Sequence, residues 1–212
     1  MKRSFDAIAF DWGGIFTVGT FDGTAVTNLS TATGTDRQYL EPIYLRLMAD
    51  FEIGAFQMPG FHQRFCEATG TSLSLGEFRR IFLGSVRERA STFDLLAAIP
   101  AGYTVGMLSN NSPELCDLVR DDPRNARFEK FVFSNEIGVR KPAPEAFAAL
   151  TEALGVAPER TVFIDDNADN IAACEALGFT GLLLDEPRAF SARWRTALPE
   201  LPLPASFEEA SA

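Results

Sequence analysis

The chain has 212 residues, 46% of them hydrophobic, and a formal net charge of −10. This composition excludes a disordered chain and allows one large core with a smaller appended domain. The negative charge disfavours nucleic acid and anionic membrane surfaces as partners. An anionic ligand would therefore need a local positive charge or a metal ion to receive it.

The sequence carries no sign of export or of membrane insertion. Its three cysteines, Cys66, Cys116 and Cys174, lie far apart without CxxC spacing, which is typical of buried thiols in a reducing compartment. No apolar run has the length of a membrane span, and no apolar segment precedes the first predicted strand as in a signal peptide. We therefore expect a cytoplasmic protein without a membrane partner.

The first predicted element is a strand over residues 7–11, with the sequence Ala-Ile-Ala-Phe-Asp. Its unbroken apolar run is typical of a strand buried on both faces of a parallel sheet. Asp11 ends the run and Gly13 and Gly14 follow shortly, so the carboxylate would lie where open α/β sheets bind ligands. When this stretch is considered alone, an Asp that only begins a turn is the simpler interpretation.

A helical block is predicted after this strand. Residues 17–35 are rich in Thr, Gly, Ser and Asp, and we interpret them as a loop. Amphipathic helices are predicted from near Asp36, over residues 58–68 and from near Ser74, because apolar residues recur there at spacings of three and four. No convincing strand interrupts this block, which indicates a separate helical cap.

Strands and helices alternate in the second half of the chain. Such alternation is typical of a doubly wound parallel sheet, so we predict a Rossmann-like α/β fold with an inserted α-helical cap. The core domain is predicted over residues 1–16 and 91–212, and the cap domain over residues 17–90. The proline-rich tail after residue 198 is predicted to be irregular. The later strands are predicted at residues 103–108, 131–133, 161–164 and 181–184.

Polar side chains follow the predicted strands at their carboxyl ends. Because these ends share one edge of a parallel sheet, we expect the polar groups to converge on one crevice. Carboxylates packed together repel one another unless a cation lies among them, and an oxygen-rich set suits Mg²⁺. A turn or a solvated loop would explain each group taken singly. The residues are Asp11, Ser109, Asn110, Lys141, Asp165, Asp166 and Asn170.

The ordered set of motifs resembles the haloacid dehalogenase superfamily of hydrolases. The first motif is the strand that ends at Asp11, and the second is residues 108–110, Leu-Ser-Asn. The third is residues 138–142, Gly-Val-Arg-Lys-Pro, and the fourth is residues 162–170, whose wording is similar to the phosphatase branch. Each motif alone is weak. Their order, with a helical insertion between the first and second, makes the resemblance specific.

The resemblance implies a hydrolase that removes the phosphoryl group of a small phosphorylated metabolite, with sugar phosphates among the candidates. Asp11 would be the nucleophile that forms an aspartyl phosphate. Ser109 and Asn110 would bind the phosphoryl group, and Lys141 would bind it and neutralise its charge. Ser109 and Lys141 thereby join Asp11 as catalytic residues. A monomer or a homodimer is expected.

The resemblance also implies a magnesium site. Mg²⁺ would be held by the side chains of Asp11 and Asp166 and by the carbonyl of Gly13. Asn170 would support the ion directly or through water. Asp165 would orient the neighbouring lysine or the water of the metal.

One position departs from the family pattern. Phosphatases of this family usually carry a second Asp two positions after the nucleophile, as general acid and base, and here that position is Gly13. A 2-haloacid dehalogenase, whose halide leaving group needs no proton, is therefore an alternative. A catalytically silent phosphate-binding protein is another. Asp166 argues against dehalogenation, which needs no metal ligand.

The cap is expected to select the substrate, because it is inserted between two strands whose ends share the crevice. Four of its polar or aromatic side chains are candidates for this role. The pattern does not decide which of them face the crevice. They are Arg37, Tyr39, Tyr44 and Phe56.

Overall fold

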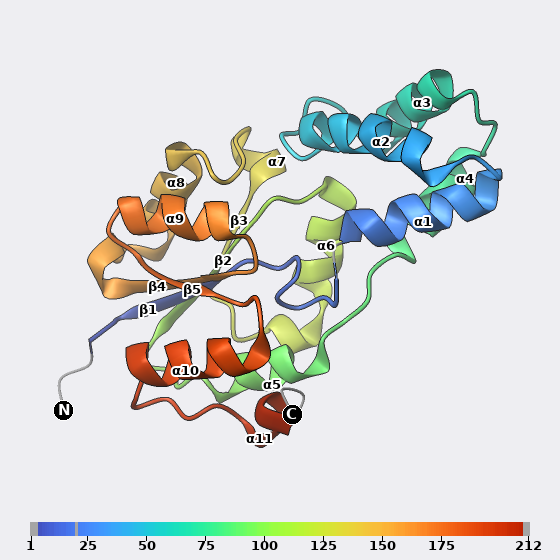
Figure 1. Ribbon diagram of the computed structural model, residues 1–212. Coiled ribbons are helices and arrows are strands. Elements are labelled where there is room, and N and C mark those ends of the chain that lie inside the picture. Colours follow the sequence, from blue (N-terminus) through green and yellow to red (C-terminus); the bar gives the residue numbers. More distant parts are fainter. Residues whose placement is uncertain (1–3, 20, 210–212) are drawn as a thin grey trace.

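The computed structural model describes residues 4–19 and 21–209, and its centre is a sheet of five parallel strands (Figure 1). The strand order β3-β2-β1-β4-β5 confirms the predicted doubly wound α/β fold with a helical insertion after the first strand. The strands are β1 (Ala7–Phe10), β2 (Thr104–Ser109), β3 (Lys130–Phe133), β4 (Thr161–Asp165) and β5 (Thr180–Leu183).

Strand β1 lies in the middle of the sheet, and all of its residues are buried. Phe10, its last residue, is in register with Met107 of β2 and with Ile164 of β4. These three strands therefore end at nearly the same level. The residues that follow them are placed side by side although they are far apart in the sequence.

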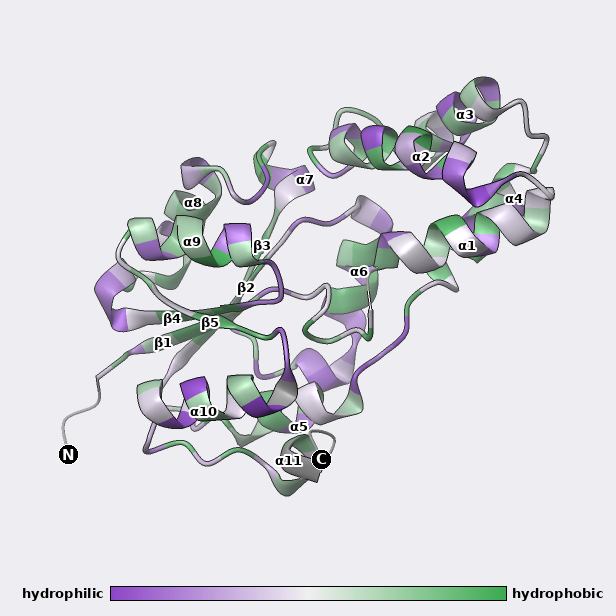
Figure 2. Ribbon diagram, in the orientation of Figure 1, coloured by the Kyte–Doolittle hydropathy of each residue, from purple (hydrophilic) through white to green (hydrophobic). Residues whose placement is uncertain are grey.

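Helices cover both faces of the sheet, and successive residues of β1 point to opposite faces. Ile8 and Phe10 belong to the cluster under α5, α10 and α11, whereas Ala7 and Ala9 belong to the cluster under α8 and α9. Figure 2 shows hydrophobic central strands between helices that carry hydrophilic outer faces. The core helices are α5 (Ala90–Ala98), α6 (Pro113–Asp121), α7 (Ser134–Ile137), α8 (Pro144–Leu154), α9 (Ala168–Ala176), α10 (Pro187–Ala197) and α11 (Ala205–Glu209), and two short 3₁₀ helices cover Pro123–Asn125 and Pro158–Arg160.

Four helices between β1 and α5 form a separate layer to one side of the sheet (Figure 1). They share a hydrophobic cluster of their own, in which the ring of Phe61 lies 4.9 Å from Phe51 and 5.3 Å from Phe78. Such aromatic pairs add stabilisation beyond the area that they bury. Leu115 of α6, in the sheet domain, also belongs to this cluster. The helices, called the cap below, are α1 (Phe21–Thr33), α2 (Arg37–Phe51), α3 (Met58–Thr69) and α4 (Leu75–Leu83).

The prediction of a loop over residues 17–35 is wrong, because most of the segment is helix α1 (Phe21–Thr33). Hydroxyl groups often compete with the backbone for hydrogen bonds and disfavour helices. Here Thr27, Thr31 and Thr33 each donate to the carbonyl four residues earlier, which leaves the helix intact. One face is apolar and packs into the cap cluster. Its buried residues are Ala25, Val26 and Leu29.

The prediction for the tail is also corrected. Helix α10 precedes it, and its apolar residues Phe190 and Trp194 are spaced by four and fully packed. The indole N–H of Trp194 donates to the carbonyl of Leu201 at 2.6 Å, which ties the irregular segment to the core. Helix α11 follows it and buries Phe207. Among the described residues, no helix has both the length and the apolar character that crossing a membrane requires.

Candidate active site

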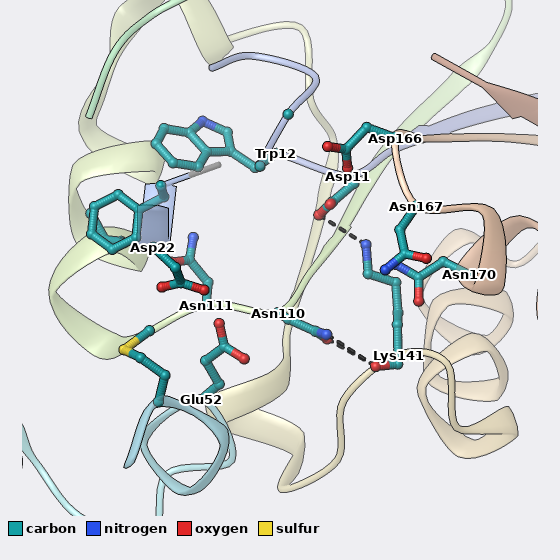
Figure 3. A pocket seen from close by; sticks show the side chains of 15 residues that line it. Asp11, Trp12, Asp22, Glu52, Asn110, Asn111, Lys141, Asp166, Asn167 and Asn170 are labelled. Atoms are coloured by element: carbon teal, nitrogen blue, oxygen red, sulfur yellow. Dashed lines mark hydrogen bonds and ion pairs between the residues drawn. The ribbon is translucent and has the colours of Figure 1, made fainter. Parts of the chain in front are cut away.

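A buried lysine joins two strand ends of the sheet. The Nζ atom of Lys141 lies 2.9 Å from Oδ1 of Asp11, just after β1 (Figure 3). The same atom lies 2.6 Å from Oδ2 of Asp165, at the end of β4. Lys141 is only 3% exposed, and Asp165 is fully buried. A buried ammonium needs such partners, because desolvation without them would remove its charge. The predicted site residues Asp11 and Asp165 are thereby brought together around Lys141.

Asp165 is held by several donors besides this lysine. The side-chain amide of Asn170 donates to both of its carboxylate oxygens at 3.1 Å, and the backbone N–H of Asn167 donates to Oδ1 at 2.9 Å. The carboxylate therefore has little freedom to move. Asp165 therefore contacts both Lys141 and Asn170. The roles expected for Asp165 and Asn170 beside the metal ion stay predictions.

The side chain of Asn110 fixes the backbone at Lys141. Its Oδ1 accepts from the N–H of Lys141 at 2.8 Å, and its Nδ2 donates to the carbonyl of Lys141 at 3.1 Å. The amide of Asn110 is thus engaged at both ends, which positions the ammonium from the backbone side. Ser109 is buried at the end of β2. Phosphoryl binding by Ser109 and Asn110 stays a prediction.

Three carboxylates gather beside the lysine. Asp11, Asp165 and Asp166 each offer an oxygen, and these atoms lie within 4.8 Å of one another. Burial raises the pKa of Asp11 to about 7, opposed by Lys141 and reinforced by Asp165. Clustered carboxylates with oxygen-only donors are the ligand set that Mg²⁺ prefers. The residues present therefore fit the expected ion. Asp11 and Asp166 are the freer pair, because both oxygens of Asp165 already accept hydrogen bonds, whereas Asp11 meets Lys141 with one oxygen only.

The two glycines after Asp11 differ in their backbone requirements. Gly14 has φ +67°, and a Cβ atom there would lie 1.8 Å from Oδ2 of Asp166, so only glycine lets this loop approach that carboxylate. Gly13 is not in the left-handed region, and its Cβ would lie 3.9 Å from Oδ2 of Asp11. The backbone therefore explains Gly14 but does not require Gly13.

Asp11, Lys141 and Asp166 line a cavity of about 180 Å³ between the sheet edge and the cap. On the cap side, Asp22 and Glu52 face the cavity, and Glu52 pairs with Nη2 of Arg140 at 2.8 Å. Burial raises the pKa of both carboxyl groups, that of Glu52 to about 7. The lining residues are Asp11, Trp12, Gly13, Gly14, Phe21, Asp22, Met48, Glu52, Asn110, Asn111, Leu115, Lys141, Asp166, Asn167 and Asn170.

Comparison with protein families identifies the chain. Residues 5–178 match the family described as haloacid dehalogenase-like hydrolase. The chain belongs to this family. The match includes the loop after β1, the end of β2, Lys141 and the acids after β4, which are the segments that form the sheet side of the cavity.

The chain is also similar to individual proteins and solved structures. D-ribitol-5-phosphate phosphatase of Bacteroides thetaiotaomicron is 28% identical over 185 residues, covering 81% of this chain and 88% of that protein. The structure of a predicted HAD-like family hydrolase from Porphyromonas gingivalis has a TM-score of 0.75 at 26% identity, covering 94% and 98%. A HAD family enzyme of Bacteroides thetaiotaomicron, solved with magnesium and inorganic phosphate, has a TM-score of 0.72 at 22% identity, covering 84% and 93%. The last likeness shows the fold alone.

The cap side of the cavity in this haloacid dehalogenase-like hydrolase, called the cap wall below, includes Asp22 and Glu52. These are not the residues that the sequence offered as candidates. None of the four cap candidates, Arg37, Tyr39, Tyr44 and Phe56, lines the cavity. Asp22 was missed because its segment was interpreted as a loop. Glu52 follows Tyr44 and Met48 at spacings of four, which places it on the buried face of the helix. An acidic residue at such a position was the signal that could have identified it.

Proposed function

We propose that this hydrolase is a Mg²⁺-dependent phosphatase of small phosphomonoesters, with sugar phosphates as candidate substrates. The observation that carries the proposal is the buried Asp11–Lys141–Asp165 arrangement beside Asp166 at the floor of the cavity. The phosphatase named among its relatives and the magnesium and phosphate bound by a protein of the same fold support it.

Asp11 would act as the nucleophile. One of its carboxylate oxygens would form a bond to phosphorus while the bond from phosphorus to the leaving oxygen breaks, and water would then release phosphate from the aspartyl phosphate. Lys141 keeps a positive charge beside Asp11, which favours the ionised form and opposes the rise in pKa caused by burial. Asp165 holds the ammonium in place during both steps.

The side chains of Asp11 and Asp166 and the carbonyl of Gly13 would hold Mg²⁺. A bound ion supplies charge neutralisation for the phosphoryl oxygens and for the clustered carboxylates. Because Gly13 has no side chain, the leaving oxygen would take its proton from water or leave without one. Leaving groups of low pKa should therefore react fastest.

A 2-haloacid dehalogenase is the second candidate, because Gly13 removes a general acid that halide departure does not need. The cluster of Asp11, Asp165 and Asp166 argues against it, since a metal-free displacement gains nothing from three adjacent carboxylates. A silent phosphate-binding protein is the third candidate.

One experiment separates the three. Release of inorganic phosphate from p-nitrophenyl phosphate and from a panel of small sugar and polyol phosphates is measured with Mg²⁺ and after exhaustive chelation. We expect turnover with Mg²⁺ that chelation abolishes and that added Mg²⁺ restores. Halide release from 2-haloacids without metal, or phosphate binding without any turnover, would contradict the proposal.

A further inference from the structure

The cap side of the cavity carries polar groups that the proposed phosphoryl chemistry does not use. Figure 3 shows Asp22, Asn111 and Glu52 gathered on one side of the cavity, and Asp11 and Lys141 on the other. A phosphomonoester placed for attack by Asp11 would direct its leaving group away from the sheet edge, because the attacking and leaving oxygens lie roughly in line through phosphorus. The groups on the cap side are therefore placed to contact the leaving group rather than the phosphoryl group.

Asn111 presents a donor to this space. It is only 3% exposed, and its Nδ2 has no hydrogen-bond partner among the described residues. Its Oδ1 accepts from the N–H of Ser112 at 3.0 Å, which fixes the orientation of the amide. A buried donor without a partner costs about 1–3 kcal/mol, so an oriented and unpaired donor in a cavity indicates a ligand acceptor.

Asp22 and Glu52 present acceptors to the same space. The carboxyl group of Asp22 interacts with the buried hydroxyl of Tyr44, and its Oδ1 is buried without a further hydrogen-bond partner among the described residues. Oε2 of Glu52 pairs with Arg140, and the backbone carbonyl of Glu52 accepts from Ser134, whose Oγ in turn accepts from the N–H of Asn111. This chain of contacts fixes the position of Glu52 relative to Asn111.

The mixture of donor and acceptors selects among leaving groups. A carboxylate or a second phosphate would meet the carboxylates of Asp22 and Glu52 and be repelled. An ammonium group could use these carboxylates but not the donor of Asn111. A hydroxyl group both donates and accepts, so adjacent hydroxyls satisfy both kinds of partner. The small cavity volume, about 180 Å³, suits a leaving group of a few carbon atoms.

We propose that Asp22, Asn111 and Glu52 form a subsite that binds the hydroxyl groups of a small, uncharged, polyhydroxylated leaving group. This inference rests on the proposed phosphatase function and narrows its substrates. It excludes substrates whose leaving group carries a carboxylate, such as phosphoglycolate, as efficient substrates of this chain.

The test is a selectivity ratio. With Mg²⁺, kcat/KM is measured for ribitol 5-phosphate, pentyl phosphate, phosphoglycolate and p-nitrophenyl phosphate. The wild type should prefer ribitol 5-phosphate over pentyl phosphate and over phosphoglycolate by about 10-fold or more, the size expected from one or two hydrogen bonds to a charged group.

Two variants preserve shape and change one group each. Asp22→Asn removes the charge. Asn111→Asp keeps the acceptor for Ser112 and replaces the donor with a carboxylate oxygen, which repels the acceptor of the ligand. Each should lower the ratio of kcat/KM for ribitol 5-phosphate to that for p-nitrophenyl phosphate by about 10-fold or more. Asp22→Asn should also raise the relative activity on phosphoglycolate. Asp50→Asn, at an exposed carboxylate of α2, is the matched control and should change neither ratio.

The outcomes distinguish this inference from the proposed function. If the wild type hydrolyses none of the phosphates, the proposed function fails. If it hydrolyses p-nitrophenyl phosphate but does not discriminate ribitol 5-phosphate from pentyl phosphate, the subsite is overturned and the phosphatase assignment stands. The same conclusion follows if folded variants, checked by circular dichroism, retain the selectivity ratio of the wild type.

Discussion

The two walls of the cavity carry carboxylates in different states. On the sheet side, Asp11 and Asp165 share the ammonium of Lys141, at 2.9 and 2.6 Å. On the cap side, Asp22 has an unpaired oxygen, and Glu52 has a cation partner, Arg140, whose side chain is 40% exposed. On the sheet side, contacts within the protein hold Asp11 and Asp165 in place before any ligand binds, although one lysine does not balance the three clustered carboxylates. The cap wall keeps hydrogen-bonding capacity for something outside the protein.

This difference separates reaction from recognition. A set of charges that is held rigidly suits a chemical step that is the same for every phosphomonoester, because such charges need little reorganisation. An uncompensated set suits selection among leaving groups, because its cost is recovered only by a ligand with matching donors and acceptors. Changes on the sheet wall should therefore affect all substrates, and changes on the cap wall should affect them unequally.

The largest effect is expected from Asp11→Asn. This substitution removes the nucleophile, so kcat should fall by at least about 10³-fold for every phosphomonoester. Without Mg²⁺ the melting temperature should be unchanged or higher, because one of the clustered carboxylates is neutralised. Phosphate release and thermal unfolding measure the two effects. Activity near that of the wild type on any substrate would disprove the role of Asp11.

Lys141→Met should reduce stability as well as activity. It leaves Asp11 and Asp165 buried without their cation, and breaking a buried ion pair in this way costs about 3–5 kcal/mol. Arg120→Ala breaks the exposed pair with Glu136 and should cost less than about 1 kcal/mol. Urea denaturation of both variants gives the comparison. Equal losses would mean that the sheet wall is not held together by its lysine.

Gly13→Asp should restore a general acid, because its backbone and surroundings accept a side chain. A positioned acid contributes roughly 10²–10⁴-fold to a step that needs proton transfer. Alkyl phosphates should gain more than p-nitrophenyl phosphate, which flattens the dependence of kcat/KM on leaving-group pKa. A wild-type slope near zero, with chemistry limiting the rate, would show that another residue already supplies the proton.

The smallest effect is expected from Glu52 on the cap wall, through the pH dependence of the free energy of unfolding. Burial raises the pKa of Glu52 from 4.5 to about 7, although Arg140 opposes the rise. Between pH 4.5 and about 7, the folded state therefore keeps a proton that the unfolded state has released. The stability that this bound proton contributes is lost as pH rises through that range. Glu52→Gln should flatten the decline in the free energy of unfolding, measured without Mg²⁺. Asp50→Asn is the control, and an unchanged slope in Glu52→Gln would contradict the assignment.

The sheet wall was predictable from the sequence because it obeys a local rule. Each of its polar residues directly follows a strand or a motif loop, and parallel strands deliver such residues to one edge, as Asp11 and Asp165 illustrate. The family resemblance implied that Asp165 orients Lys141, but the residues alone did not show that this lysine lies between the two acids. That contact depends on how Asn110 holds the backbone of Lys141, which is a tertiary feature.

The cap wall was not predictable for a different reason. Asp22 lies in a helix whose Thr and Gly content hides its periodicity, and its own cluster of buried residues decides that it is helical. Which face of a cap helix meets the cavity depends on how the cap packs on the sheet domain. That packing uses contacts such as Ser134 with Glu52, between residues more than 80 positions apart.

The central claim is that Asp11 on the sheet wall receives the phosphoryl group. It is tested most directly by acid-quenching the wild-type enzyme during turnover of p-nitrophenyl phosphate with Mg²⁺ and mapping the covalent adduct by mass spectrometry. We expect one phosphoryl group on the peptide that contains Asp11, and none in Asp11→Asn. A phosphoryl group on any other residue, or turnover by Asp11→Asn at the wild-type rate, would contradict it.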